Sequence, residues 1–520
     1  MKDNLRRALT FAAAGLCVVA IFLLVWLLGA RSDSQRQPDL RFSIYGEVVD
    51  EHGPVAGVQV RKAGSVDVAM TSAAGRFIYP MGWMATFWKD GYFIESDEGQ
   101  PGSKLIRLRE LPATDHEEYS WQRAEPETYE YGQYRACGSC HQAIFDEWKL
   151  GAHANATRNQ HFRNLFEGSD KFSSPGIGWN LRQERPDGVS VCTSCHAPTQ
   201  QSDFLVDDDV SEDQRDRRRN DELSGVHCDY CHKVVGPADG KVGLAHGQYG
   251  LKLLRPKDQQ LLFGPLTDST RSTNAYSAFQ HQSRLCASCH EGIVFGVPVY
   301  TTYSEWQASP SARAGVQCQD CHMKPTGKMT NIAPGHGGVE RDPKTLANHV
   351  FFDGSRDEML RRCLKLSVNA KRNGNDVRVS VELMAEGVGH RVPTGFVDRN
   401  LVMLVEALDV VGNPLAVSDG PRLPAIAGRM VAGKTGRLYA KQLKDFDGHS
   451  PVPFWRADPE VTDTRLEPGK LDSSAWRFPA AATQIRVRIL HRRFWPEVAE
   501  AKGWGDNEVL LLERKVVPGE

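Results

Sequence analysis

Ten of the twelve cysteines in this 520-residue chain belong to five copies of one short pattern, Cys-x-x-Cys-His. At this composition chance would produce roughly 0.009 copies of the pattern in the whole chain. The pattern is the usual sequence signal for covalent haem attachment. In chain order, the cysteines of the first to fifth motifs are Cys137 and Cys140, Cys192 and Cys195, Cys228 and Cys231, Cys286 and Cys289, and Cys318 and Cys321. The histidines that close the five motifs are His141, His196, His232, His290 and His322.

The chemistry of haem attachment explains this spacing. Two thiols must reach the two vinyl groups on one edge of a porphyrin, and an imidazole must bind the iron from the same side. Residues three and four apart lie on one side of a helical turn, so the two cysteines and the histidine converge there. Because histidine is the usual proximal ligand of haem iron, the sequence predicts five c-type haems.

Other uses of paired cysteines explain the pattern less well. Zinc ribbons need pairs of Cys-x-x-Cys units, and five is an odd number. Disulfides or redox thiols suit an oxidising compartment, but they leave the histidine after every second cysteine unexplained. The two remaining cysteines, Cys17 and Cys363, are interpreted as buried structural thiols.

The five motifs are crowded together in the chain. They lie between Cys137 and His322 and leave about 37 residues of chain for each haem. So short a segment cannot enclose each haem in a separate core. Neighbouring porphyrins must therefore supply much of the apolar interior, at the short separations that electron transfer requires.

A second axial ligand for each iron must come from outside the motifs. Ten further histidines follow the start of the first motif, and five of them would suffice for a closed, low-spin set of haems. The predicted distal ligands are His153, His349, His336, His246 and His281. His161 and His227 are reserves, whereas His390 would serve only if its separate β domain docks on the haems. We interpret His449 and His491 as structural.

An apolar segment, Ala8–Ala30, precedes all these features and contains no charged residue. At ~1.5 Å per residue it is long enough to cross a hydrocarbon core of about 30 Å. The basic residues before it favour an N-terminus on the inner side. A cleaved signal peptide is the alternative, although its apolar region is usually about 7–15 residues long. Both interpretations place the chain from about residue 31 in the periplasm or outside the cell, and the first predicts a single-pass protein of the cytoplasmic membrane.

The sequence predicts β structure in two further segments. From Arg41 to about Leu111, short apolar alternations broken by glycine and proline indicate a small β-sandwich. Beyond the motifs, two alternating runs flank the turn residues Asn373 and Gly374, which predicts a β-hairpin and a second sandwich.

The expected fold is therefore multidomain. It comprises a single N-terminal transmembrane helix, a small β-sandwich, a mainly helical and irregular multihaem cytochrome c domain, and a C-terminal β-sandwich. The expected boundaries of these four parts are 1–33, 41–112, 125–355 and 360–520.

The residues around the first motif, CGSCHQAIFDEWKLGAHANA, resemble the cytochrome c-554 family of multihaem cytochromes. In that family an aromatic-rich helix follows the motif and leads to a tryptophan and a distal histidine, which match Trp148 and His153 here. The segments NHVFFDG around His349 and GHRVPTG from Gly389 are similar to those after the last haem in related cytochromes. The resemblance implies a periplasmic electron carrier with stacked haem pairs.

The N-terminal stretch also carries a resemblance. YGEVVDEHGPVAGVQV from Tyr45, and TSAAGRF from Thr71, are similar to carboxypeptidase regulatory-like domains. That resemblance implies a non-catalytic spacer that holds the haem region away from the membrane.

The leading hypothesis is electron transfer between a membrane quinol oxidoreductase or other redox proteins and acceptors outside the membrane. Nucleic acid is not an expected partner, because the net charge of −2 includes no basic domain. One alternative is an oxidoreductase of the nitrite or hydroxylamine type with one open haem; another is a quinol dehydrogenase. Nitrite reductases typically have one motif that ends in lysine, whereas all five motifs here end in histidine.

Overall fold

The computed structural model describes residues 42–125, 136–200, 211, 225–351 and 356–520. These residues form two compact units. The first contains residues 42–89 and 95–109, and the second contains residues 90–94 and all described residues from Glu110 onward.

The membrane anchor expected from the sequence is corrected here. In the described residues no helix is both long enough and apolar enough to cross a membrane. The segment Ala8–Ala30, on which that expectation rested, lies outside the described residues. The fold is therefore described without a transmembrane helix, and the assignment to the cytoplasmic membrane is withdrawn.

The first unit consists of two small sheets. One has the order β4-β1-β7 and the other the order β3-β2-β5-β6. The strands are β1 (Ser43–Val49), β2 (Gln59–Lys62), β3 (Val68–Met70), β4 (Arg76–Pro80), β5 (Ala85–Trp88), β6 (Glu95–Asp97) and β7 (Ser103–Arg107). Phe77 of one sheet contacts Phe87 of the other edge to face, with ring centroids 5.0 Å apart, and both rings are buried. The sheets thus pack against each other around an aromatic core.

The second unit begins with a region of short helices and two-stranded sheets. Its helices are α2 (Cys137–Cys140), α3 (Gln142–Lys149), α4 (Gln160–Glu167), α5 (Leu181–Glu184), α6 (Val189–His196), α8 (Cys228–Cys231), α9 (Arg284–His290), α10 (Thr302–Gln307), α11 (Pro310–Arg313), α12 (Cys318–His322) and α13 (Arg356–Cys363). Its strand pairs are β8 (Val234–Pro237) with β9 (Leu251–Leu253), β10 (Leu262–Gly264) with β11 (Asn274–Tyr276), and β12 (Glu291–Val294) with β13 (Val297–Thr301).

The helices of this region are short because the chain carries local start and stop signals. In α4 the Asn159 side chain accepts a hydrogen bond from Phe162 N, which caps the first turn. Gly168 ends the same helix in the left-handed conformation, with φ 70°.

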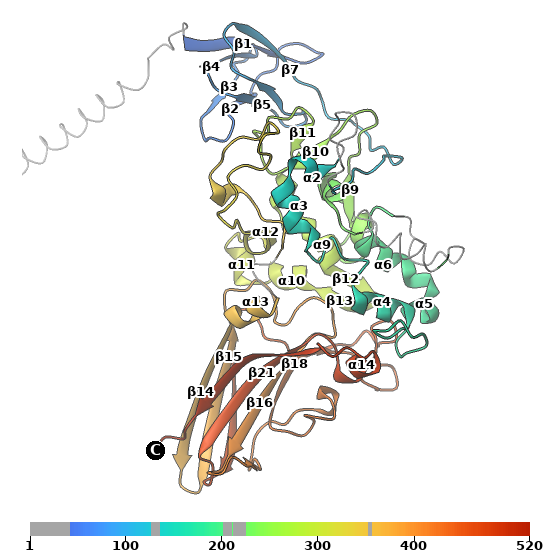
Figure 1. The fold of residues 1–520 in the computed structure, drawn as a ribbon, viewed down its shortest axis with the longest axis vertical. Coiled ribbons are helices and arrows are strands. Elements are labelled where there is room, and N and C mark those ends of the chain that lie inside the picture. The colour runs from blue at the N-terminus through green and yellow to red at the C-terminus, as the bar shows by residue number, and fades with distance from the viewer. Residues whose placement is uncertain (1–41, 126–135, 201–210, 212–224, 352–355) are drawn as a thin grey trace, which may run out of the picture. The chain divides into compact units, whose positions relative to one another are not determined.

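The C-terminal part of the second unit is built from long antiparallel strands (Figure 1). The strands are β14 (Leu364–Asn373), β15 (Asp376–Ala385), β16 (Asn400–Leu408), β17 (Pro414–Leu415), β18 (Gly436–Gln442), β19 (Thr462–Asp463), β20 (Leu471–Pro479), β21 (Gln484–Arg492) and β22 (Glu508–Val516). One sheet has the order β14-β15-β20 and the other the order β19-β18-β16-β21-β22, with β17 beside β16; helix α14 (Pro496–Ala501) lies between β21 and β22 in the chain.

The predicted hairpin is confirmed. Asn373 pairs with Asp376 at the end of β14 and β15, and Gly374 takes the left-handed φ of 61° that a two-residue turn needs. Along β15 buried and exposed residues alternate, so one face enters a core that both sheets share.

Strand β16 is buried on both faces, and this property joins the C-terminal sheets to the helical region. Leu401 and Met403 enter the core between the two sheets. Val402 and Leu404 belong instead to a second cluster, together with Leu165 of α4 and other residues of α5 and α6. The C-terminal sheets are therefore docked on the segment that contains the second motif.

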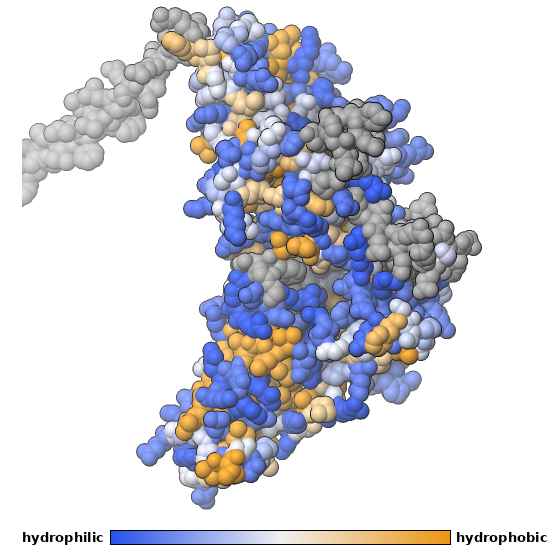
Figure 2. Space-filling model, in the orientation of Figure 1, coloured by the Kyte–Doolittle hydropathy of each residue, from blue (hydrophilic) through white to orange (hydrophobic). Residues whose placement is uncertain are grey.

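Polar and apolar residues are distributed differently over the surfaces of the helical region and of the C-terminal strands (Figure 2). Figure 2 shows hydrophilic residues over most of the visible helical region, with apolar patches over the C-terminal strands. Exposed apolar residues of that part include Leu471, Leu510 and Val517.

Candidate functional site

Each of the five motifs lies on a short helix. The motif helices are α2, α6, α8, α9 and α12, and in each case the motif histidine ends or directly follows the helix. A single turn is sufficient, because the two cysteines and the histidine need only three- and four-residue spacings on one side. The sequence expectation about local geometry is met in all five motifs.

The motif cysteines form no disulfides, and all but the exposed Cys321 are partly buried. All eleven cysteines in the described part of the chain are unpaired by disulfides. Burial raises the pKa of Cys192 and of Cys231 to about 12. Both thiols are therefore protonated at neutral pH.

Thiols of different motifs meet one another. Three pairs of thiols lie close enough for one to raise the pKa of the other: Cys137 acts on Cys228, Cys289 on Cys195, and Cys318 on Cys286. Cys231 also lies close enough to Cys289 for the charge of Cys289 to raise its pKa, after burial. The first motif therefore meets the third, and the fourth meets the second, the third and the fifth.

Four of the five motif histidines are oriented in the same way. In each, the ring Nδ1 lies within hydrogen-bonding distance of a backbone carbonyl oxygen, which favours a tautomer with a proton on Nδ1 and a free Nε2. The pairs are His141 with Ile332 O at 2.8 Å, His196 with Ala156 O at 3.0 Å, His232 with Phe263 O at 2.6 Å, and His322 with Phe351 O at 3.2 Å. A free Nε2 is the nitrogen that an axial ligand of iron uses.

Two motif histidines face a second imidazole. The ring centroids of His290 and His153 are 6.3 Å apart, and their planes differ by 73°. The ring centroids of His322 and His390 are also 6.3 Å apart, with an angle of 15° between the planes. Burial lowers the pKa of His153 to about 4 and that of His290 to about 3, so both rings are neutral at pH 7.

Two more predicted distal histidines lie near motif histidines. The pKa of His349 is lowered to about 4, first by burial and then by the charge of the neighbouring His232. Burial lowers the pKa of His141, and His336 contributes to that shift. His349 is thus a neighbour of the third motif, and His336 of the first.

The second motif has a different partner. The ring of His196 stacks on Phe162, with centroids 3.8 Å apart and an angle of 9° between the planes. His246 bonds to the backbone of Ile293, and the next residue, Gly247, packs directly on Ser194 of the second motif. His246 is therefore beside the second motif without stacking on His196.

The other sequence candidates are held elsewhere. His281 is exposed, and its Nε2 lies 3.2 Å from Pro265 O. His227 is buried, with its Nε2 3.0 Å from Thr199 Oγ1. His161 lies between Phe494 and Trp504, at centroid distances of 5.2 and 4.6 Å.

The sequence made His390 a candidate ligand only if its β domain docks on the haem region, and the structure places its ring beside His322. A network of charged side chains holds its loop against α10: Arg391 N donates to Glu305 Oε2 at 3.1 Å, and Arg465 contacts both Glu305 and Asp463. Lys441 and Arg391 line a cavity of about 480 Å³ in the same network. No local spacing signals this position, because it depends on the docking of the C-terminal strands.

The third motif is anchored by a buried ion pair. Lys233 contacts Asp229, and both side chains are fully buried. Asp229 also accepts hydrogen bonds from Tyr119 Oη at 2.9 Å and from Gln122 N at 2.8 Å. Since removal of one partner from such a pair costs about 3–5 kcal/mol, this network fixes the third motif against the preceding segment.

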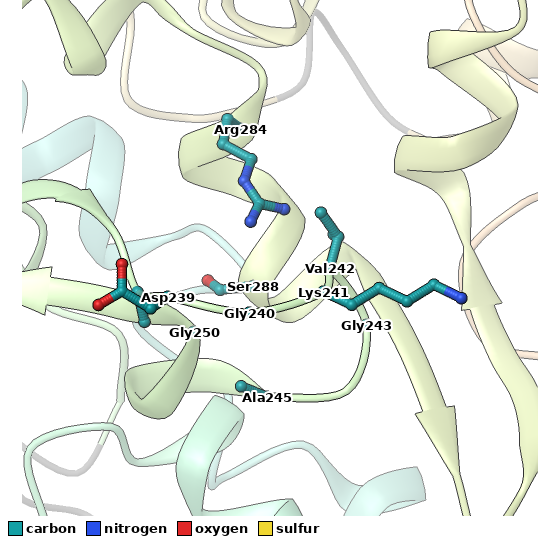
Figure 3. Close-up of a pocket in the computed structure, with 10 residues that line it drawn as sticks. Asp239, Gly240, Lys241, Val242, Gly243, Ala245, Gly250, Arg284 and Ser288 are labelled. Carbon is teal, nitrogen blue, oxygen red and sulfur yellow. The ribbon is translucent and has the colours of Figure 1, made fainter.

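A loop of small residues covers the fourth motif. Figure 3 shows Asp239, Gly240 and the neighbouring loop residues beside Arg284 and Ser288 of α9. The cavity between them is only about 10 Å³, the space of a single water molecule. Close packing of this loop therefore supports α9 and leaves no room for a ligand.

Gly247 makes the closest approach of this loop to a motif. Its φ is 56°, and a Cβ at this position would lie 1.8 Å from Ser194 O. We expect Gly247→Ala to lower the free energy of unfolding by about 2–4 kcal/mol, because strain and a backbone clash add. Thermal unfolding of the haem-loaded protein measures this change. Gly374→Ala is the control, because its φ is 61° and there is open space around the added methyl group. If both variants lose the same free energy of unfolding, the clash at Gly247 is relieved without cost.

Comparison with known proteins gives the following matches. Residues 136–233 match the model of the family described as cytochrome c554 and c-prime. A penta-heme cytochrome c552 from Thermochromatium tepidum is similar in structure, with a TM-score of 0.52 and 21% identity over 73% of this chain and 97% of that one. The Fcho1 Mu homology domain of Danio rerio with a bound Eps15 peptide aligns with 14% identity over 32% of this chain and 48% of that one; its TM-score of 0.12 carries no structural meaning. No curated protein sequence matches the chain.

Proposed function

Because this chain is a multihaem c-type cytochrome, we propose that each of its five motifs holds one haem and that the chain is an electron relay. In this proposal the ten motif cysteines form the thioether bonds, and the five motif histidines are the proximal ligands. The observation that carries the proposal is the meeting of thiols from different motifs. Haems attached at adjoining thiols lie close enough together for electrons to pass between them.

The spacing of the two facing histidine pairs fits a shared iron. A metal–imidazole bond is ~2.0 Å long, and the ring centre lies ~1.1 Å behind the bonding nitrogen. Two imidazoles on one iron therefore have centroids ~6.2 Å apart. The pairs His153 with His290 and His322 with His390 are both separated by 6.3 Å.

The same reasoning revises the distal set. We propose His153 as the distal ligand of the fourth motif, His390 of the fifth, His349 of the third and His336 of the first. His246 remains the candidate for the second motif, beside which it lies. His281 is replaced by His390 in this set, because Nε2 of His281 bonds to Pro265 O whereas the ring of His390 lies 6.3 Å from that of His322.

The contacts between motifs suggest an order for the relay. The first motif leads to the third and the third to the fourth, and the second and fifth both adjoin the fourth. Haem iron with two imidazole ligands supplies one-electron exchange without an open position for substrate. Backbone carbonyl oxygens hold Nδ1 of four motif histidines in place, and other redox proteins would donate and accept the electrons.

Mass spectrometry and electron paramagnetic resonance (EPR) spectroscopy of the purified protein test this proposal. We expect the mass of five haems per chain and only low-spin ferric signals. Fewer than five haem masses would refute the count. A high-spin signal would show that at least one iron lacks a second protein ligand.

An oxidoreductase with one open haem is the second candidate, and the surroundings of His196 favour it. Among the described residues the ring beside His196 is that of Phe162, and no second imidazole faces His196 as His153 faces His290 and His390 faces His322. In this version the second motif keeps an open position, and nitrite and hydroxylamine are the first substrates to assay. A high-spin signal that shifts on addition of nitrite would support the enzyme, whereas its absence would favour the closed relay with His246 as ligand.

A further inference from the structure

Phe351 touches axial histidines that belong to three different motifs. Its carbonyl oxygen lies 3.2 Å from Nδ1 of His322, in the fifth motif. The edge of its ring lies against His153, with centroids 4.3 Å apart and an angle of 86°. The ring of His349 is the third neighbour, at 6.3 Å.

The backbone of Phe351 is held in a conformation that such a residue rarely adopts. Its φ is 64°, in the left-handed region that disfavours bulky side chains. A residue persists there only where its surroundings determine its conformation, and such residues gather at functional sites. The conformation serves both contacts, since it directs the carbonyl to His322 while the ring meets His153.

The segment before Phe351 is fixed by its own hydrogen bonds. Asn348 is buried, and its N donates to Met323 O at 3.1 Å, one residue after His322. Its side chain donates to Lys324 O and accepts from Val350 N. His349 N donates to Glu147 Oε2 at 2.8 Å. Phe351 is thus the end of a rigid arm that begins at the fifth motif.

His153 lacks the carbonyl partner that orients four of the motif histidines. Among the described residues no hydrogen bond to its ring nitrogens is found, whereas four motif histidines bond to a carbonyl. The ring of Phe351 therefore supplies the contact that prevents rotation of the His153 imidazole.

We propose that Phe351 is a positioning residue for two neighbouring haems: its ring sets the imidazole plane of His153 at the fourth motif, and its carbonyl orients His322 at the fifth. This inference rests on the proposed function, because it uses the proposed axial ligands. The proposal predicts different EPR spectra for the two haems. The two imidazole planes are 73° apart at the fourth motif and 15° apart at the fifth, and the larger angle gives the larger anisotropy of the ferric signal.

EPR spectroscopy with potentiometric titration of the five-haem protein tests the inference through two variants. Phe351→Gly removes the ring, but glycine readily keeps φ positive and hence the carbonyl in place. We expect it to shift or remove the highly anisotropic signal and to leave the signal of the fifth haem unchanged. Phe351→Val cannot keep this backbone conformation, so it should change both signals and both reduction potentials. Phe351→Tyr keeps the ring and should restore the highly anisotropic signal.

Phe295→Gly is the matched control. Phe295 also has a left-handed φ, 53°, but its ring contacts Phe454 and Arg185 instead of a histidine. This variant should leave both signals unchanged. If Phe351→Gly leaves the highly anisotropic signal intact in a protein with five low-spin haems, the inference is wrong while the proposed function stands. If the parent protein lacks those haems, the proposed function itself has failed.

Discussion

Replacement of Cys286 and Cys289 by alanine is expected to remove one haem and to divide the relay into unconnected parts. The fourth motif adjoins three others through its thiols, so every proposed path to the second or fifth motif passes through it. After flash photoreduction, redistribution of an electron between the first and fifth haems should disappear. The free energy of unfolding should also fall by several kcal/mol, because the apolar surface of a porphyrin is no longer buried at ~25 cal/mol per Å².

The matched control removes a haem at the end of a branch. Replacement of Cys318 and Cys321 by alanine also costs one haem, but the fifth motif adjoins only the fourth through its thiols. Redistribution among the remaining four haems should persist in this variant. If both double variants retain the same redistribution rates, the fourth motif is not a junction and the proposed order of haems is wrong.

Replacement of His390 by alanine is expected to convert one of the five haems from low spin to high spin. In the proposed arrangement this histidine is the distal ligand of the fifth motif, opposite His322 at a centroid distance of 6.3 Å. Its loss leaves an iron with a single protein ligand, which raises the reduction potential and permits binding of an added ligand such as cyanide. Quantitative EPR spectroscopy should assign about one fifth of the ferric iron to the new signal.

His281→Ala is the control for this experiment. The ring of His281 is exposed and bonds to Pro265 O, so its removal should change neither the spin states nor the potentials. A high-spin signal from His281→Ala, combined with a normal spectrum of His390→Ala, would restore the ligand set expected from the sequence. High-spin signals from both variants would point to a larger rearrangement around the fifth motif.

Local spacing was a sufficient guide to the helical geometry of the five motifs. A cysteine pair and a histidine within five residues occupy one helical turn in any fold, so α2, α6, α8, α9 and α12 form the geometry that the pattern predicts. The hairpin of β14 and β15 was predictable for a similar reason. Alternation and a glycine in the turn define it without help from distant residues.

The membrane anchor shows the limit of a compositional argument. Length and apolarity made Ala8–Ala30 a candidate, but the described residues contain no helix that could span a membrane. A hydropathy pattern cannot by itself distinguish an anchor from a segment that is removed or otherwise placed.

The sequence by itself determined where the five candidate attachment motifs lie, because the residues of each motif are neighbours in the chain. Only the tertiary structure decided which histidines face one another, because those partners lie far apart in the sequence and meet through docking. His390 reaches His322 since β16 is apolar on both faces and packs the C-terminal sheets against the helical region. Phe351 likewise contacts His153 and His322 across long stretches of chain. The axial environment of each motif is therefore a property of the packing.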